Sequence, residues 1–193
     1  MKQKAVAACS WAFALSLVLV FPISLSDVAK AQLLDSNLSL SILAQQLQTP
    51  DQIARYMWRN FAFEEDQRNF GTEDHMQSPE EFLQTRKGDC EDFARFAYEL
   101  LKMNGVDAFI MNIYGGQYAH SICVFKENGN YQAIDGTNVR RYNAKHLNDL
   151  SSQIYAFWKT SMIVSPSPVS GGATVLAEFS KRMDSRRRLG IFS

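Results

Sequence analysis

The hydrophobic pattern of this chain changes period once, near residue 105, and that change limits the folds open to it. Residues 90–103 carry apolar side chains at i, i+3, i+4, i+7 and i+8, which is typical of a helix with one buried stripe. Residues 106–114, 119–126 and 131–135 are instead rich in β-branched and aromatic residues, which favour strands. Helices followed by consecutive strands predict an α+β fold, with the helices packed on an antiparallel sheet.

Turn residues mark the ends of these elements. Asn104-Gly105 ends the helix, and Gly115-Gly116 separates the first two strands. Asn128-Gly129 lies between the second and third strands and is a strong hairpin signal. The three strands are therefore expected to pair consecutively.

Two further helices are predicted upstream. Thr49 can cap a helix that has Pro50 in its first turn and extends to about residue 61. Ser78, followed three residues later by Glu81, is the signature of a capping box and starts a shorter helix. The polar stretch between these two helices is expected to be a loop.

The N-terminus has the layout of a secretory signal. A basic segment, residues 1–4, precedes an apolar run over residues 5–24, and Ala29-Lys30-Ala31 offers small residues for cleavage after Ala31. An uncleaved membrane anchor is the alternative, since about 20 apolar residues can span a bilayer. Lipid attachment at Cys9 is rejected because Cys9 starts the apolar run. We expect an exported protein, periplasmic or secreted, whose contact with a membrane is limited to this segment.

Four segments are predicted along the chain. In order, they are a signal peptide, an N-terminal arm or helix, one folded domain, and a linker with a basic tail that has some helical character: residues 1–31, 32–48, 49–164 and 165–193. The last part of the domain is expected to hold a short helix over residues 143–150 and a strand over residues 154–164. The roughly 160 residues after the signal suffice for one domain with a substantial core.

Charge and cysteine content exclude several kinds of function. The formal net charge is zero, so no electrostatic feature favours nucleic acid, and the three arginines at 186–188 lie in the predicted tail. Cys90 and Cys123 remain after loss of the signal, and in an oxidising compartment they could form a disulfide. No cysteine pair has metal-ligand spacing and the three histidines are scattered, so neither a metal nor another cofactor is expected.

Cys90 occupies the first turn of the most regular helix, directly after Lys87-Gly88-Asp89, where Asp89 can act as the cap. Unpaired backbone N–H groups and the helix dipole favour a thiolate there. Cys90 also lies three residues before Phe93, at the edge of the buried stripe, and should point toward the sheet. These features suit a nucleophile, although a buried cysteine is more often a small hydrophobic residue.

His120 and Asp135 supply the partners that a thiol nucleophile needs. His120 lies near the start of the second strand and Asp135 ends the third, so counting back from the hairpin turn brings both to its open end. With both on one face, Asp135 could fix the imidazole tautomer while His120 exchanges protons with Cys90. Alternation puts Cys123 on the other face of its strand from His120, which argues against a Cys90–Cys123 bridge.

The nucleophile segment, residues 86–94, resembles the cysteine motif of the transglutaminase-like superfamily, most closely that of the bacterial transglutaminase-like cysteine proteinases. Residues 101–108 resemble the passage that follows this motif, and 119–121 and 131–137 resemble the family's histidine and aspartate motifs. The resemblance implies that residues 49–164 form a catalytic domain with a papain-like core. It also implies acyl transfer through a thioester, with a triad of the three matching residues Cys90, His120 and Asp135.

The chain departs from the family at Ile122, two positions after the histidine, where many members carry an aromatic residue. The domain is also short. Both differences leave open the shape of the substrate groove, and with it the choice between hydrolysis and transfer. For the oxyanion of acyl transfer, the backbone N–H of Cys90 is the expected first donor, and Gln84 and Trp58 are candidates for the second.

Three functions follow from these features. The first is a cysteine peptidase or amidase that acts on a peptide, isopeptide or side-chain amide in a protein or in the cell wall. The second is transamidation, in which an amine accepts the same thioester. The third is a degenerate, non-catalytic binding domain, which would require a Cys90 sulfur far from His120.

Overall fold

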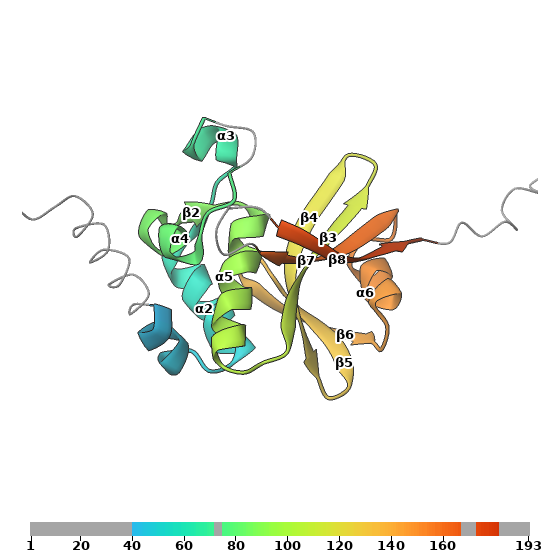
Figure 1. Cartoon of the computed structure of the whole chain (residues 1–193), viewed down its shortest axis with the longest axis horizontal. Coiled ribbons are helices and arrows are strands. Elements are labelled where there is room, and N and C mark those ends of the chain that lie inside the picture. Colours follow the sequence, from blue (N-terminus) through green and yellow to red (C-terminus); the bar gives the residue numbers. More distant parts are fainter. Residues whose placement is uncertain (1–39, 72–74, 167–172, 182–193) are drawn as a thin grey trace, which may run out of the picture.

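The computed structural model describes residues 40–71, 75–166 and 173–181. Helices gather on one side of a six-stranded antiparallel sheet, and α5 stands between the other helices and that sheet (Figure 1). A further helix, α6 (Leu147–Ile154), covers the opposite face. The α+β prediction is confirmed.

The helices begin where the sequence predicts. Thr49 caps α2 (Pro50–Asn60) by accepting a hydrogen bond from the Gln52 N–H, and the Gln52 side-chain oxygen accepts one from the Thr49 N–H. Ser78 caps α4 (Pro79–Thr85) through the Glu81 N–H. The main helix, α5, spans Cys90–Met103 and is capped by Asp89.

Residues 40–46 form another short helix, within the segment expected to be an arm or helix. Leu40 and Ala44 are buried in the helical side of the core. The remainder of that segment and the signal peptide lie outside the described residues. Among the described residues, none belongs to a helix long and apolar enough to cross a membrane.

The sheet has the strand order β6-β5-β4-β3-β7-β8. Its strands, in chain order, are β3 (Ala108–Gly115), β4 (Tyr118–Glu127), β5 (Asn130–Asp135), β6 (Asn138–Ala144), β7 (Thr160–Pro166) and β8 (Ala173–Ser180). A separate parallel pair joins β1 (Ala62–Phe63) to β2 (Lys87–Gly88), through the register Ala62↔Lys87 and Phe63↔Gly88. This pair ties the segment after α2 to the residues before Cys90.

The periphery differs from the sequence predictions in four places. Residues 173–180 of the expected tail form the edge strand β8, which pairs with β7 and is not helical. Residues 138–144 form the other edge strand, β6, so the expected short helix starts later, at Leu147, and the last strand starts at Thr160. The loop after β1 contains one helical turn, α3 (Asp66–Asn69). Edge strands have one neighbour each and carry more polar residues, which weakens their alternating pattern.

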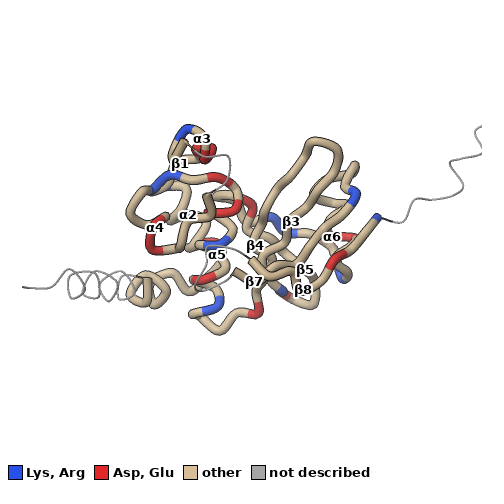
Figure 2. The backbone as a smooth tube through the Cα atoms, turned by 45° about the horizontal axis from the view of Figure 1, so that its top comes forward, with Lys and Arg blue, Asp and Glu red and all other residues tan. Residues whose placement is uncertain are grey.

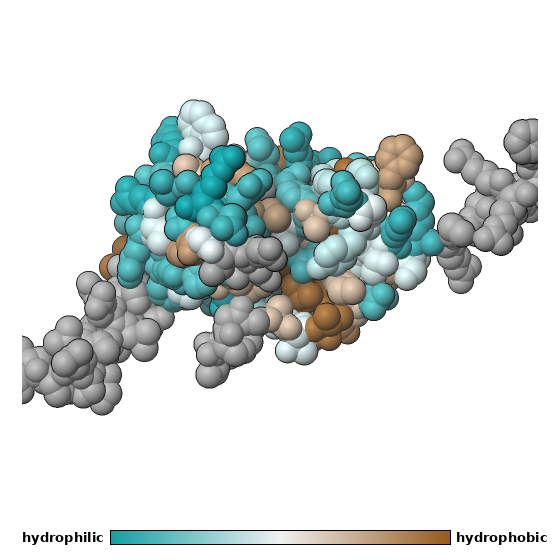
Figure 3. Space-filling model, turned by 90° about the horizontal axis from the view of Figure 1, so that it is seen from above, coloured by the Kyte–Doolittle hydropathy of each residue, from teal (hydrophilic) through white to brown (hydrophobic). Residues whose placement is uncertain are grey.

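Three hydrophobic clusters hold the layers together, and the two larger ones lie on opposite faces of the sheet. One joins α2, α4 and α5 to the side chains of Cys123, Phe125 and Ile134. The other lies on the α6 side of the sheet and includes Ile122 and Val124. The outer surface seen in Figure 3 is mostly hydrophilic, with hydrophobic residues gathered in small areas.

Phe96 lies at the centre of the helical cluster. Its side chain is fully buried and packs edge to face against Phe61 and Phe82, at ring-centroid distances of 5.0 and 5.7 Å. Phe96→Ala should therefore lower the free energy of unfolding by about 3–5 kcal/mol, measured by urea denaturation. Phe157 is 76 % exposed, so Phe157→Ala should change the free energy of unfolding by no more than about 0.5 kcal/mol. Equal effects of the two changes would contradict this description of the core.

Candidate active site

Cys90 is the first residue of α5, and its position depends on how that helix begins. The Asp89 side chain accepts a hydrogen bond from the Glu91 N–H at 3.0 Å, and the Asp92 carboxylate accepts one from the Asp89 N–H at 3.1 Å. As the first helical residue, Cys90 has a backbone N–H with no acceptor inside the helix. That N–H can therefore serve a ligand beside the sulfur.

A buried polar network fixes this helix start. Asp92 is 1 % exposed, and its two oxygens accept hydrogen bonds from the backbone N–H and side-chain amide of Gln77, at 2.9 and 2.7 Å. The Gln77 amide also donates to the Lys87 carbonyl, and Thr85 donates to the Gln77 side-chain oxygen. Burial raises the pKa of Asp92 to about 6, so it is ionised at neutral pH. The network joins the segment before α4 to both sides of Cys90.

Gly88 is required by this close packing. A Cβ at this position would collide with the Asp92 carboxylate and come within 2.7 Å of the Gln77 amide nitrogen. The glycine of the Lys87-Gly88-Asp89 turn therefore leaves room for the network. The sequence shows this glycine two residues before Cys90, but gives no sign of what lies against it.

His120 and Asp135 meet at the open end of the β4–β5 hairpin. The imidazole Nε2 lies 2.7 Å from Asp135 Oδ1, and the two side chains are 22 % and 28 % exposed. The ladder between β4 and β5 begins at Cys123↔Ile134, so Asp135 stands opposite Ile122 and diagonal to His120. The pairing predicted by counting from the hairpin turn is present in the structure.

The charges of this group are strongly coupled. The hydrogen bond with Asp135, then a hydrogen bond with Cys90, raise the pKa of His120 to about 10 against the effect of burial. The same bond to His120 holds the pKa of Asp135 below its ordinary value. His120 is therefore protonated at neutral pH and faces a carboxylate on one side and the Cys90 sulfur on the other.

The three side chains line one cavity of about 520 Å³. Its other lining residues come from α2, the β1 segment, α5 and the β5–β6 turn: Trp58, Phe61, Phe63, Phe93, Gly136, Thr137 and Asn138. The structure thus brings together Cys90, His120 and Asp135, from three separate elements, at a solvent-accessible surface. The aromatic lining was not foreseen, because a short segment such as Ala62–Phe63 has no recognisable period.

Both remaining cysteines are free thiols. Cys123 is fully buried in the cluster beneath α5, and burial raises the pKa of its thiol. As predicted, strand alternation places the side chains of Cys123 and His120 on opposite faces of the sheet. The face that α5 covers is, however, the one that Cys123 occupies, so the prediction that Cys123 points away from the helix of Cys90 is wrong.

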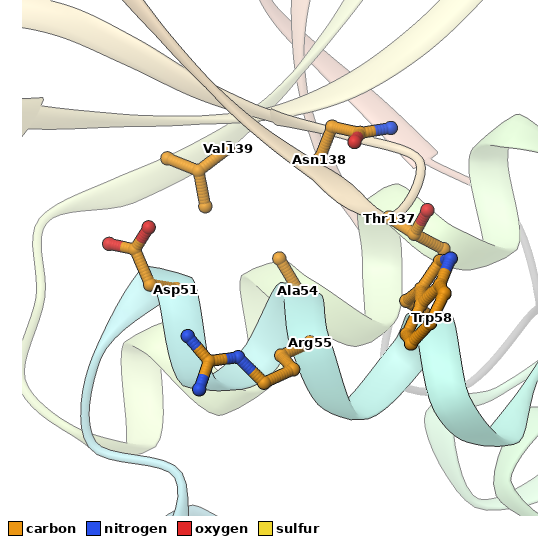
Figure 4. Close-up of a pocket in the computed structure, with 7 residues that line it drawn as sticks. All are labelled: Asp51, Ala54, Arg55, Trp58, Thr137, Asn138 and Val139. Atoms are coloured by element: carbon orange, nitrogen blue, oxygen red, sulfur yellow. The ribbon is translucent and has the colours of Figure 1, made fainter.

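The two candidates for a second oxyanion donor have different positions. Trp58 lines the cavity, with its indole nitrogen turned toward Thr137 (Figure 4). Gln84 is exposed on α4 and is absent from the cavity lining, so the structure gives it no place at this site. Tyr118, which the sequence did not single out, lies next to His120 with ring centroids 5.8 Å apart. Burial and then the charges of Asp135 and Cys90 raise the pKa of Tyr118.

Within residues 40–71, 75–166 and 173–181, no group of three or more His, Cys, Asp or Glu side chains could hold a metal ion. Basic and acidic residues are interspersed over this part of the chain (Figure 2).

A known family covers most of this structure. A family model described as a transglutaminase-like domain matches residues 31–154, which include Cys90, His120 and Asp135. Among curated proteins, none matches the chain.

Solved structures resemble the chain at low sequence identity. Calcium-bound LapG of Legionella pneumophila is 20% identical with a TM-score of 0.48, over 72% of this chain and 83% of its own. A proposed cysteine protease from Cytophaga hutchinsonii is 16% identical with a TM-score of 0.43, over 76% and 50%. A TGase is 15% identical with a TM-score of 0.39, over 72% and 40%.

The polar network around Asp92 predicts a cost for removing its charge. Asp92→Asn replaces one acceptor oxygen by a donor facing N–H groups, and it should destabilise the fold by about 1–3 kcal/mol in urea denaturation. Glu81→Gln is a matched control, because Glu81 pairs with His75 at a surface where both side chains are 40% exposed. It should cost under about 1 kcal/mol. If Asp92→Asn left the free energy of unfolding unchanged, the network would not be what holds the helix start.

The coupling of His120 to Asp135 can be measured by NMR titration of the histidine rings. The pKa of His120 should be about 10 and should fall toward the ordinary 6.5 in Asp135→Asn, because the bond to Asp135 is the largest cause of the rise. The raised value stabilises the fold fully below pH 6.5, and that stabilisation is lost as pH rises through about 10. A His120 titration unchanged by Asp135→Asn would refute the pairing.

Proposed function

The chain belongs to the family of transglutaminase-like domains, and on that premise we propose that it is an exported cysteine peptidase or amidase. One observation carries the proposal. Cys90 at a helix N-terminus, His120 and Asp135 line one cavity; His120 lies 2.7 Å from Asp135 and is close enough to Cys90 for that residue to raise the pKa of the imidazole. This arrangement supplies a nucleophile, a proton carrier and an orienting carboxylate.

The first half of the reaction forms a thioester. The Cys90 sulfur, as a thiolate beside protonated His120, adds to the carbonyl carbon of the scissile amide, and the negative oxygen that results is stabilised by the Cys90 N–H and by a second donor, for which Trp58 is the candidate. His120 then gives its proton to the amide nitrogen as the C–N bond breaks. The amine leaves, and the acyl group remains on sulfur. Asp135 holds the ring in place and stabilises its charge throughout.

The second half regenerates the Cys90 thiolate and protonated His120. A water molecule adds to the thioester carbon while His120 takes its proton, and the C–S bond breaks to release a carboxylic acid. Exposure of His120 and Asp135 lets water reach this point, which favours hydrolysis. Transamidation would follow the same path with an amine in place of water, and product analysis with added primary amine distinguishes the two.

A degenerate binding domain is the least favoured alternative. It would require the Cys90 sulfur to lie out of reach of His120, whereas both side chains line one cavity and Cys90 contributes to the raised pKa of His120. Export is proposed on the N-terminal sequence alone, from the basic segment, apolar run and small residues that precede residue 32. The substrate class is a protein, peptide or cell-wall amide.

The test is cleavage of a peptide mixture by the protein that starts at residue 32, with products identified by mass spectrometry. Cys90→Ala should reduce cleavage at least about 10³-fold, because the nucleophile is lost. The wild type should carry a hydroxylamine-sensitive acyl adduct on Cys90. Cys123→Ala is the matched control and should retain activity, since Cys123 is buried in the core. Cleavage that survives Cys90→Ala would overturn the proposal.

A further inference from the structure

The cavity around Cys90 is walled by aromatic side chains that the fold leaves exposed. Trp58 on α2 is 69% exposed and Phe63 on β1 is 66% exposed, whereas Phe61 and Phe93 beneath them are buried. The pairing of Phe63 with Gly88 holds the β1 ring beside the nucleophile segment. Large exposed aromatic residues gathered at one cavity are typical of a binding site, because they contribute little to the core.

A second cavity of about 320 Å³ continues from this one along α2 (Figure 4). The two share three lining residues, Trp58, Thr137 and Asn138. Ala54 and Val139 face each other across the second cavity, and Arg55 and Asp51 lie toward its far end (Figure 4). The two cavities therefore form one groove that passes Trp58.

The charges at the far end leave one arginine available. Asp51 is paired with Arg141, whose Nη2 lies 2.6 Å from the carboxylate, and Arg141 also contacts Glu127 at 3.3 Å. Among the ion pairs of the described residues, none includes Arg55, which is exposed in the groove. The charge of Arg55 helps to lower the pKa of Asp51, but Asp51 has its ion pair with Arg141, so a carboxylate of a ligand can pair with Arg55 while that ion pair stays intact.

The spacing along α2 fits an extended peptide. Arg55 and Trp58 are three residues apart, so their Cα atoms are separated by about 4.5 Å along the helix axis. The Arg55 side chain extends this distance by bending away from Trp58, toward Asp51 (Figure 4). An extended substrate advances about 3.3 Å per residue, so two or three of its residues cover the span.

We propose that this groove is a two-part substrate site for an extended peptide. A large apolar side chain next to the scissile amide lies among the aromatic residues at Cys90, and an acidic side chain two or three residues away pairs with Arg55. Trp58 lines both parts and lies between them. The inference rests on the proposed function and adds the class of sequence that the site would accept.

The experiment measures binding in the absence of turnover. A random peptide library is selected on the immobilised Cys90→Ala protein that starts at residue 32. Selected peptides should pair a large apolar residue with Asp or Glu two or three positions away. In Cys90→Ala/Arg55→Glu, the acidic preference should be lost and replaced by Lys or Arg, with affinity for the original peptides at least about tenfold lower.

Arg59→Glu in the same background is the matched control. Arg59 is also exposed on α2 and lines neither cavity, so the acidic preference should persist. No selected sequence pattern, or a pattern that Arg55→Glu and Arg59→Glu alter equally, would overturn the two-part site. Separately, wild-type protein is incubated with the selected peptides. Binding without cleavage would contradict the proposed function but not the two-part site. Cleavage at the same rate with and without the acidic residue would contradict the two-part site but not the proposed function.

Discussion

The buried carboxylate of Asp92 is the constraint on which the site depends. It accepts hydrogen bonds from Gln77 and from the Asp89 backbone, so the start of α5 is fixed to the chain on both sides of the nucleophile. An ionised group in the protein interior is costly unless donors surround it, and here both oxygens are satisfied. The sulfur of Cys90 is thereby held at one place relative to the sheet, although the residue itself lies at a surface.

The sheet supplies the other half of the site by independent means. The β4–β5 hairpin sets the register that brings His120 and Asp135 within 2.7 Å, and the cluster beneath α5 presses the helix onto the same two strands. Neither the hairpin register nor the packing of α5 alone makes a reactive centre. Together they place a protonated imidazole between a carboxylate and a thiol, in a cavity that continues as a groove along α2.

The sequence predicted those parts of this arrangement that local chemistry controls. Asp89 as a cap, the Asn128-Gly129 turn and the position of Asp135 relative to His120 all follow from short-range rules, and the family match confirms the resemblance drawn from them. What it could not show depends on long-range packing. Gln77 lies in a stretch without period, yet it is the main partner of Asp92. The edge strands β6 and β8 have few buried residues, so their pattern resembled a tail or a turn.

The central claim is that His120 and Asp135 make Cys90 a nucleophile. Its most direct test is the rate at which iodoacetamide alkylates Cys90 near neutral pH, followed by mass spectrometry in the wild type, His120→Ala and Asp135→Asn. We expect fast alkylation of Cys90 in the wild type and no alkylation of the buried Cys123 in the folded protein. In His120→Ala the rate of Cys90 alkylation should be at least about tenfold lower. Asp135→Asn should fall between the two. Equal rates in all three proteins would contradict it.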